Sequence, residues 1–445
     1  MASRANALMG LLNGAERANA HTLQEHQRSA WRRQVDYVAR SSKFYSSRWS
    51  GVTPPEDLDH IGRLPLVDKE DLRAAQRELP PFGSYLAASS SMVTRVHRTG
   101  GTTGEAMNLA LSASDARTTA TVGARSQSAS GLGPDDVVIH CLNYQLWMGG
   151  FTDHTTLEAT GATVVPFGVG NPRLLIRTIQ ELGVTAISCT PSYPAVLAQV
   201  LAEDGIDPRS LGLRLGLFGG EAALDVPGFR ERLEETWGIA ARNSNYGVTD
   251  VMCNFAGQCT EQNDLHFMGL DVLYPEIIEP ASGQSLMWEP GTRGELVLTH
   301  LERDCQPLVR FRTGDIVELT AIDTCVCGRT APRFRVIGRA DDMVVVRGVN
   351  VFPTSVAALI NGDAELTGEY RITLAGPGPY DRLSIEVEAV HTPSNPEQAR
   401  AHYDQLAERI AVTARRDLRV TAQVTVVANA SLPRTEGKTR RVVRS

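Results

Sequence analysis

Between residues 90 and 240, short runs of β-branched and other apolar residues alternate with longer stretches of helical periodicity. This alternation predicts strands joined by helices, and strands joined in this way form a mainly parallel sheet. We expect buried strands at residues 136–142, 162–167, 184–190 and 213–220, and helices at residues 114–129, 172–182 and 193–204. The centre of the chain is therefore predicted to be α/β.

The segments on either side of this centre have different patterns. The N-terminal segment has helical periodicity, and Asp68 can cap a short helix at residues 69–77. Residues 270–345 are rich in strand patterns. After Gly348 an α+β pattern follows, with helices at residues 355–360 and 397–416 and strands at residues 370–374, 383–390 and 420–427. We place a domain boundary near residues 339–342.

Length, charge and hydropathy exclude several classes of protein. The chain has 445 residues, of which 42% are hydrophobic, and this is enough for two or three domains with a large core. A net charge of −7 without basic blocks disfavours a nucleic-acid partner. No apolar run approaches the roughly 20 residues of a membrane helix, and no signal peptide is evident. We expect a soluble, cytoplasmic protein without a membrane or nucleic-acid partner.

Lysine and cysteine are used sparingly. Almost all basic residues are arginine, and the only lysines are Lys43, Lys69 and Lys438. A lysine that persists in such a chain is a candidate for a position that requires lysine. Seven cysteines in a cytosolic chain disfavour a disulfide framework, and the close pair Cys325 and Cys327 favours metal binding.

Three segments carry groups suited to a nucleotide. The loop Arg98–Glu105 contains three glycines and three threonines, whose N–H and hydroxyl groups suit phosphate oxygens. It is not a Walker A loop, because Glu105 stands where the lysine would be. The segment 245–250 offers a ring for a base and a carboxylate for a metal, and the segment 310–315 offers a carboxylate for a sugar diol. Taken alone, these segments could be a plain turn, a strand end and a hairpin.

Two further motifs complete an ordered set of five. Residues 338–342 lead into a hydrophobic strand, and residues 433–441 contain Lys438 in what could otherwise be a frayed basic tail. Together the five motifs resemble the adenylate-forming superfamily of acyl-CoA ligases, adenylation domains and luciferases. The resemblance is closest to phenylacetate-CoA ligases and extends from about residue 25 to the end, through SSKFYSSRW, LPLVDKEDLR, RTGGTTGEAMNL, TPSYPAVL, YGVTDVM, CVCGRTAPRF and GRADDMVVVRGVNVFPTSV.

The resemblance implies a fold and a division into domains. The fold would be α/β, with a large N-terminal adenylation domain of mainly parallel sheets plus a β-rich subdomain, residues 1–338. Residues 339–342 would be a hinge. Residues 343–445 would form a small, mobile α+β C-terminal domain that carries the catalytic lysine.

The resemblance also assigns residues to the nucleotide site. The loop that would close over the β- and γ-phosphates of ATP consists of Thr99, Gly100, Gly101, Thr102, Thr103 and Gly104. Glu221 and Tyr246 would border the adenine, and Asp315 would bind the ribose hydroxyls. The same site would include Gly247, Thr249, Asp250 and Arg339.

Three residues are expected to be catalytic. Lys438 would bridge the carboxylate and α-phosphate oxygens, where one cation between two anionic groups stabilises the transition state. Asp341 would be the pivot of the hinge, and Arg339 would lie beside it near the ribose or the phosphates. A hinged domain allows the lysine to leave before the second half-reaction.

The chain departs from the family pattern at two positions. The usual Lys-Pro after the loop is Glu105-Ala106, and the usual metal-binding glutamate is Asp250, which is one methylene shorter. A carboxylate for Mg²⁺ remains, but its reach is reduced.

A cysteine and histidine set suggests a second metal. Cys259 and His266 have the spacing Cys-x6-His, and Cys325 and Cys327 follow as Cys-x-Cys. Three thiolates with one imidazole suit tetrahedral, structural Zn²⁺. Some phenylacetate-CoA ligases are similar here. The alternative is a set of small buried cysteines plus a surface histidine.

Aromatic and sulfur-containing side chains are expected near the acid. The resemblance places the acyl pocket at Tyr144, Trp147, Met148, His154, Phe218, Gly219, Gly247 and Val248. Such side chains favour an aryl or arylalkyl acid, although each could equally belong to the core.

The expected function is ATP-dependent activation of a carboxylic acid to an acyl-adenylate, with pyrophosphate release, followed by transfer to coenzyme A. One alternative is transfer to a carrier-protein thiol or an amine. A different class is a non-catalytic protein that binds a nucleotide and zinc. The expected cofactors and partners are ATP, Mg²⁺, Zn²⁺, coenzyme A or a carrier protein, and a small-molecule acid. A homodimer is left open.

Overall fold

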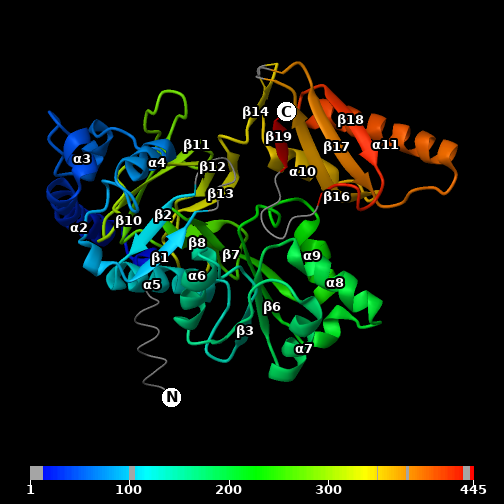
Figure 1. Cartoon of the computed structure of the whole chain (residues 1–445), viewed down its shortest axis with the longest axis horizontal. Helices are drawn as coiled ribbons and strands as arrows, with labels where there is room; N and C mark the ends of the chain where they lie inside the picture. Colours follow the sequence, from blue (N-terminus) through cyan, green and yellow to red (C-terminus); the bar gives the residue numbers. More distant parts are fainter. Residues whose placement is uncertain (1–13, 100–105, 348, 377–379, 434–440, 445) are drawn as a thin grey trace. The chain divides into compact units, whose positions relative to one another are not determined.

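The structure of the chain is a computed structural model, and it describes residues 14–99, 106–347, 349–376, 380–433 and 441–444 (Figure 1). The chain divides into two compact units. The first comprises Met1–Gly220 and Thr236–Val336, and the second comprises Glu221–Glu235 and Ile337–Ser445. The change of unit after Val336 lies close to the expected boundary at residues 339–342, while the hinge itself stays a prediction.

Helices form the N-terminal part of the first unit, as expected. Asp68 accepts hydrogen bonds from the N–H groups of Glu70 and Asp71, and the Asp71 side chain accepts one from the N–H of Asp68. This capping box fixes the predicted start of the short helix. The helices are α2 (Ala20–Ser41), α3 (Lys43–Arg48) and α4 (Lys69–Glu78), with 3-10 turns η1 (Ala15–Arg17), η2 (Leu58–Arg63) and η3 (Ser90–Met92).

An 11-stranded sheet forms the centre of the first unit, in the order β10-β11-β12-β13-β9-β8-β7-β6-β5-β3-β4. The strands from β4 to β7 pair in parallel, as the alternating pattern predicts. These strands are β3 (Val137–His140), β4 (Thr163–Pro166), β5 (Ala186–Cys189), β6 (Leu215–Gly219) and β7 (Ala240–Val248). Side chains along β5 and β6 are buried throughout, which accounts for their continuous apolar runs.

Helices connect the parallel strands, and one of them matches its predicted range. Asn171 caps α7 by accepting a hydrogen bond from the N–H of Leu174, and Pro172 occupies the first turn. Gly183 ends this helix with a φ of 58°, a conformation that favours glycine. The helices are α5 (Ala113–Ala129), α6 (Met148–Glu158), α7 (Pro172–Leu182), α8 (Tyr193–Glu203) and the 3-10 turn η4 (Pro208–Leu211).

The other half of the sheet is antiparallel and contains the strand-rich region expected from the sequence. Pairing changes direction between β7 and β8. The strands are β8 (Met252–Gln258), β9 (Leu265–Phe267), β10 (Leu273–Ile278), β11 (Arg293–His300), β12 (Phe311–Ala321) and β13 (Arg333–Arg339). A separate hairpin of β1 (Arg95–Arg98) and β2 (Asn108–Leu111) carries the glycine-threonine loop.

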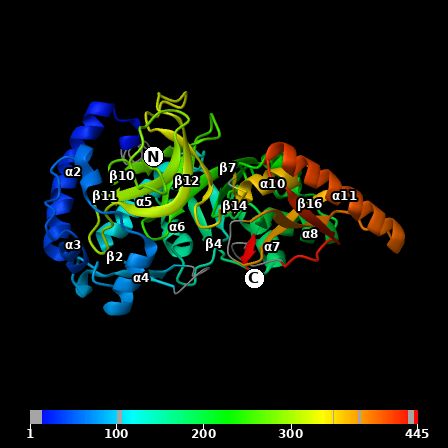
Figure 2. The same ribbon diagram turned by 90° about the horizontal axis from the view of Figure 1, so that it is seen from above.

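The second unit has its own core and a four-stranded sheet in the order β18-β17-β16-β19. Figure 2 shows α10 and α11 beside these strands. The elements are α9 (Phe229–Trp237, which runs on into the first unit), β14 (Val344–Val346), β15 (Val349–Val351), α10 (Pro353–Asn361), β16 (Leu366–Leu374), β17 (Leu383–Ala389), α11 (Pro396–Asp417), β18 (Ala422–Val427) and β19 (Val442–Arg444). The predicted class, α/β with a small α+β C-terminal part, is confirmed.

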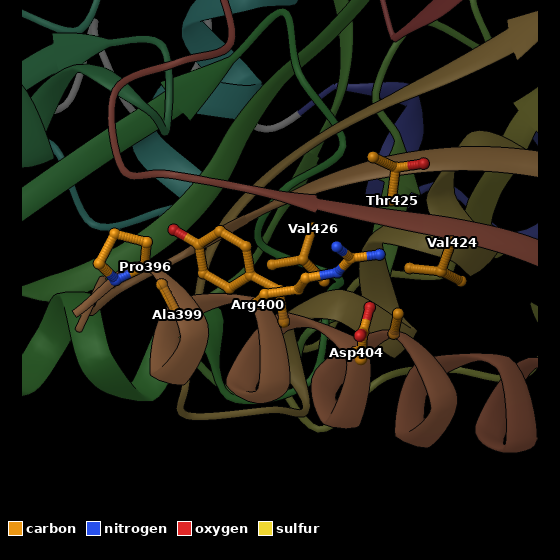
Figure 3. A pocket seen from close by; sticks show the side chains of 9 residues that line it. Pro396, Ala399, Arg400, Asp404, Val424, Thr425 and Val426 are labelled. Atoms are coloured by element: carbon orange, nitrogen blue, oxygen red, sulfur yellow. The ribbon is translucent and has the colours of Figure 1, made fainter. Parts of the chain in front are cut away.

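A groove of about 570 Å³ lies between α11 and the edge strand β18 (Figure 3). Arg400 and Asp404 are the charged residues that line it, beside Tyr403 and residues 424–426 of β18. These groups form no recognisable catalytic or metal-binding set.

In the described part of the chain, no helix combines the length and the apolar character needed to cross a membrane.

Candidate functional site

The second and third motifs meet across the sheet. Asn245 to Val248 end β7, and Asp315 lies on β12. The Tyr246 hydroxyl donates a hydrogen bond to the Asp315 carboxylate at 2.8 Å. Asp315 is buried, and its own N–H donates to the Thr313 hydroxyl at 3.1 Å. Two groups assigned to adenine and ribose are therefore adjacent.

The ring of Tyr246 is held by two other aromatic rings. Phe255 lies 5.2 Å away and Phe334 lies 5.5 Å away between ring centroids, both edge-on. These contacts fix the ring plane, because edge-to-face packing is directional. Gly247 permits the tight turn into β8, since a Cβ there would lie 2.0 Å from the carbonyl oxygen of Cys253.

Asp250 is paired with a lysine that the motif analysis did not place in the site. The Lys69 ammonium lies 3.1 Å from Oδ2 of Asp250, and the Asp250 side chain is only 4% exposed. Oδ1 of Asp250 is also buried and accepts no hydrogen bond from a described residue. Lys69 is the first residue of α4, directly after its Asp68 cap. The scarcity of lysine and the family-like segment LPLVDKEDLR, which contains Lys69, were sequence signals that could have identified it.

The base of the glycine-threonine loop is closed by two hydrogen bonds. The N–H of Thr99 donates to the carbonyl of Met107 at 2.9 Å, and the N–H of Met107 donates to the Thr99 hydroxyl at 3.0 Å. Residues 100–105, which include Gly100, Gly101, Thr102, Thr103 and Gly104, lie outside the described residues. Lys438 lies outside them as well.

Arg339 and Asp341 belong to the second unit. The Arg339 guanidinium lies 2.8 Å from the Asp341 carboxylate, and both side chains are partly exposed. The Arg444 guanidinium donates to the Asp341 carbonyl at 3.2 Å. Glu221 belongs to this unit too, within the segment Glu221–Glu235.

Two residues expected in the acyl pocket, Tyr144 and His154, lie near the carboxyl end of β3. His140 ends β3, and its ring lies 5.5 Å from Tyr144 and 6.3 Å from His154. The Tyr144 hydroxyl lies 2.9 Å from Nδ1 of His154. In open α/β sheets, ligands bind at this edge of the strands.

The remaining pocket residues have different surroundings. Met148 is buried in a small cluster with Leu109, Leu111 and Cys253, and the Phe218 ring covers Gly216 inside the core. Trp147 is 39% exposed. Gly219 approaches Asn245 closely, and Gly247, Val248 and Thr249 are half-buried at the end of β7.

A buried carboxyl group connects α6 to the second motif. Asp153 is fully buried, and burial raises its pKa to about 7 against the hydrogen bonds of Thr156, Asn245 and Asn254. Its Oδ2 has no hydrogen-bond partner among the described residues. This group therefore keeps its proton to a higher pH than an exposed aspartate does.

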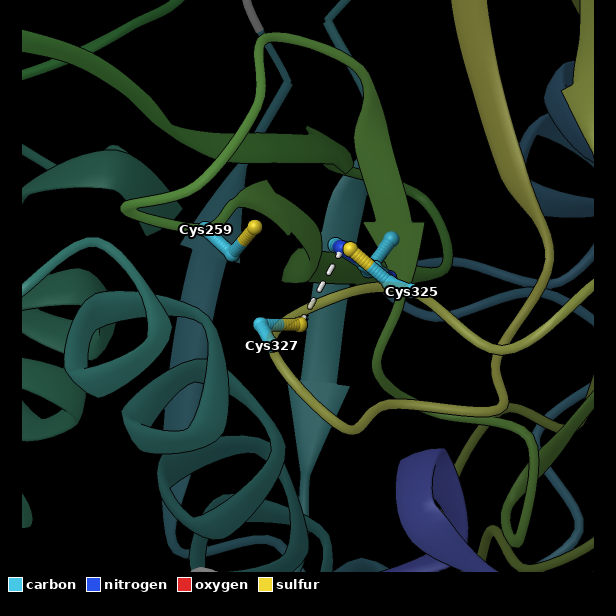
Figure 4. Close-up of side chains that lie close together, drawn as sticks. Cys259, Cys325 and Cys327 are labelled. Carbon is cyan, nitrogen blue, oxygen red and sulfur yellow. Dashed lines mark hydrogen bonds between the residues drawn. The ribbon is translucent and has the colours of Figure 1, made fainter.

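The four cysteine and histidine residues predicted to bind metal come together (Figure 4). The ligand atoms of Cys259, His266, Cys325 and Cys327 all lie within 4.8 Å of one another. Nε2 of His266 lies 3.7 Å from Sγ of Cys327, and Nδ1 of His266 is buried without a hydrogen bond to any described residue. His266 lies on β9, and Cys259 directly follows the end of β8.

Cys325 and Cys327 lie on a tight turn, which brings their Sγ atoms to the cluster. The N–H of Gly328 donates to the carbonyl of Cys325 at 2.8 Å, and Gly328 has a φ of 79°. Burial and nearby arginines lower the pKa of His266 to about 4, which keeps the imidazole neutral, as a metal ligand must be. A soft donor set of this kind fits Zn²⁺.

Comparisons with known proteins identify the family. The family model of AMP-binding enzymes matches residues 68–300, and the model of the AMP-binding enzyme C-terminal domain matches residues 348–445. The phenylacetate-coenzyme A ligase of Thermus thermophilus is 33% identical over 94% of this chain and 95% of its own length. The chain belongs to the phenylacetate-coenzyme A ligase family of AMP-binding enzymes. The resemblance stated from the motifs is thereby confirmed.

A second relative and a solved structure support the same assignment. The phenylacetate-coenzyme A ligase of Escherichia coli is 31% identical, over 97% of each chain. A crystal structure of 2-hydroxyisobutyryl-CoA ligase, in complex with 2-HIB-AMP, superposes with a TM-score of 0.86 at 29% identity. It covers 97% of this chain and 91% of that chain. The predicted fold of an adenylate-forming ligase is confirmed by this likeness.

Proposed function

We propose that this member of the phenylacetate-coenzyme A ligase family activates a carboxylic acid with ATP and transfers the acyl group to coenzyme A. The observation that carries the proposal is the direct hydrogen bond between Tyr246 and Asp315, with Asp250 four residues after Tyr246. This arrangement supports a nucleotide site at the end of β7. The names of the relatives support an aryl or arylalkyl acid as the substrate class.

The first half-reaction forms a mixed anhydride. A carboxylate oxygen attacks the α-phosphorus of ATP, the bond from that phosphorus to the bridging oxygen of pyrophosphate breaks, and pyrophosphate leaves. Negative charge gathers between the two reacting groups, and Lys438 is proposed to neutralise it. The loop at residues 99–104 would hold the β- and γ-phosphates, and Asp315 would position the ribose.

The second half-reaction forms a thioester. The thiol of coenzyme A gives up its proton to water, its sulfur attacks the acyl carbon, the bond from that carbon to the phosphate oxygen breaks, and AMP leaves. This attack needs the space that Lys438 occupies during the first step. We propose that rotation at Asp341 removes the lysine, as a hinge between two domains allows.

Asp250 is the proposed ligand for the Mg²⁺ that accompanies ATP. Lys69 holds Oδ2, and the lone pairs of Oδ1 are left without a hydrogen bond from the described residues. A water between Oδ1 and the ion would compensate for the shorter side chain, since Mg²⁺ keeps several of its waters. The ion would neutralise phosphate charge.

Zn²⁺ is the proposed occupant of the site formed by Cys259, His266, Cys325 and Cys327. Four protein ligands leave no position for a reactive water, so the role would be structural. The ion would hold the turn at residues 325–328 against β8 and β9.

A pyrophosphate-release screen over a panel of carboxylic acids tests this function. Release that depends on the acid supports adenylation and contradicts a non-catalytic nucleotide-binding protein. Parallel reactions with coenzyme A, with a carrier protein and with simple amines then identify the acceptor. A thioester of coenzyme A is the expected product, and an amide or a loaded carrier protein would contradict it.

A further inference from the structure

Residues 14–18, which we call the N-terminal segment, lie against the turn at residues 325–331. The carbonyl of Glu16 accepts hydrogen bonds from the N–H groups of Thr330 and of the residue after it, at 2.8 and 3.1 Å. The Thr330 hydroxyl donates to the carbonyl of Ala18 at 2.6 Å. These bonds join parts of the chain that are more than 300 positions apart in the sequence.

The same segment reaches a proposed metal ligand directly. The Arg17 guanidinium donates to the carbonyl of Cys327 at 3.1 Å. Gly328 permits this approach, because a Cβ there would lie 2.9 Å from Nη1 of Arg17. The N-terminal segment therefore bonds to the turn that supplies two of the four proposed metal ligands.

Docking of the segment buries a carboxylate at a cost. The Glu16 side chain is fully buried, and neither of its oxygens has a hydrogen bond to a described residue. Nε of Arg125 lies 3.8 Å away, but both terminal nitrogens of this guanidinium already bond to Asp271, each at 2.8 Å. Arg329 adds a second, weaker attraction. A buried carboxylate without hydrogen bonds is expensive, so the docked state depends on the bonds to the turn.

The turn needs the metal to hold these groups in place. It joins β12 to β13 outside any strand, and hydrogen bonds within it connect Cys325 with Gly328 and Arg329. Thiolate ligation orders such a segment, because metal binding and folding of the ligand loop share one free energy. Loss of the metal therefore loosens the surface to which the N-terminal segment bonds.

We propose that the N-terminal segment is a latch whose docking is controlled by the metal. With Zn²⁺ bound, the turn holds Thr330 and Cys327 in place, and the segment is docked. When Zn²⁺ leaves, the segment is released and the Glu16 carboxylate returns to water. This inference rests on the zinc site proposed above, and it adds a conformational change that the metal controls.

Limited proteolysis of the wild-type chain tests the latch. Trypsin cleaves after arginine, and Arg17 lies within the N-terminal segment. Cleavage there requires the segment to open, because the docked residues 15–17 form a 3-10 turn that is bonded to the rest of the unit. The rate of this cut, followed by mass spectrometry, should rise at least roughly tenfold after a chelator has removed Zn²⁺, since cleavage follows the population of the opened form. Return of Zn²⁺ should restore the protection.

A matched pair of variants tests the contact without touching a metal ligand. Thr330→Ala loses the hydrogen bond to the Ala18 carbonyl, so it should keep one Zn²⁺ per chain and still be cut after Arg17 several times faster than the wild type. Thr292→Ala is the control: its hydroxyl donates to the Met287 carbonyl at 2.9 Å in another loop, so the loss of this bond should leave the cleavage rate unchanged. Equal rates in Thr330→Ala and Thr292→Ala would contradict the latch.

Elemental analysis of every sample separates the failure of the latch from the failure of the metal site. Protein that holds no zinc, and whose cleavage does not respond to added Zn²⁺, overturns both. Protein that holds zinc, but is cut after Arg17 at the same rate once the zinc is removed, overturns the latch alone. Cleavage spread over the whole chain on zinc removal also overturns it, since the metal would then hold the whole unit rather than the segment. Adenylation takes no part in these measurements, so they leave the proposed reaction to its own test.

Discussion

At the scale of single residues, the pair between Lys69 and Asp250 is the most informative finding. The two residues are 181 positions apart in the chain, so no local pattern could connect them. Their roles could be suspected separately, Lys69 because lysine is rare and Asp250 because it follows the Tyr-Gly motif. Only the fold brings α4 to the end of β7 and joins the two observations. The same holds for Tyr246 and Asp315, which sequence reasoning assigned to one nucleotide without predicting their contact.

Removal of the Lys69 ammonium should weaken adenylation. In Lys69→Met the Asp250 carboxylate loses the partner that orients it, and kcat/KM for ATP should fall by roughly tenfold, a moderate loss because Lys69 is partly exposed. Lys43→Met is the matched control, because Lys43 is exposed on α3. Asp250→Ala should lose most adenylation, and Asp250→Glu should retain much of it. A Mg²⁺ titration that is unchanged in Asp250→Asn would contradict the metal role.

Asp153 should make stability depend on pH. Its folded pKa of about 7 lies above the ordinary value of 3.8, so the folded state binds the proton more tightly. The contribution of Asp153 to the free energy of unfolding therefore falls progressively as the pH rises from about 4 through 7. Asp153→Asn removes this penalty, so its Tm should match that of the wild type near pH 4 and exceed it by an increasing margin up to pH 8. A Tm difference that is constant with pH would contradict the buried, protonated carboxyl.

At the scale of elements, local signals explain which parts were predicted well. Helix α7 matches its predicted range because Asn171, Pro172 and Gly183 all mark its ends. Helix α6 was not predicted, since its sequence MGGFTDHTTLE contains two glycines and several β-branched residues and has little helical periodicity. Tertiary packing decides such a segment. The turn at Cys325–Gly328 could be expected from Cys-x-Cys-Gly, whereas its approach to His266 depends on the pairing of β13 with β9.

The cysteine and histidine cluster predicts a metal content that can be measured. Purified protein should contain one Zn²⁺ per chain by elemental analysis. The double substitution Cys325→Ser with Cys327→Ser should remove it and lower Tm, because thiolate ligation couples metal binding to folding. Cys305→Ser is the control: this cysteine is buried elsewhere and should keep the zinc. Zinc-free protein of unchanged stability would contradict the assignment.

At the scale of the whole molecule, the proposed reaction has two halves, and these need Lys438 in different positions. The order of motifs was sufficient to predict the family and the fold. Among the described motifs, residues 245–250 lie at the end of β7 and residues 338–342 at the end of β13. A movement of the C-terminal domain about residues 339–342 is implied by the resemblance and stays a proposal. It is proposed from the chemistry, which needs Lys438 in the first step and its absence in the second.

Substitutions at the catalytic lysine and at the proposed hinge should slow different half-reactions. Lys438→Ala should lower adenylate formation by about 10²-fold or more, while thioester formation from preformed acyl-adenylate persists. Asp341→Pro should do the reverse, because proline fixes φ and hinders rotation. Asp341→Ala controls for the lost ion pair with Arg339. Equal losses in both half-reactions, for both variants, would argue against domain rotation.

The most direct test of the central claim is isotope exchange between labelled pyrophosphate and ATP without coenzyme A. Adenylation is reversible and precedes the thiol, so label should enter ATP only when the acid is present, and coenzyme A should not be needed. Thioester and AMP should then form in equal amounts once coenzyme A is added. Exchange that is independent of the acid, or a product of ADP and phosphate, would contradict an acyl-adenylate mechanism.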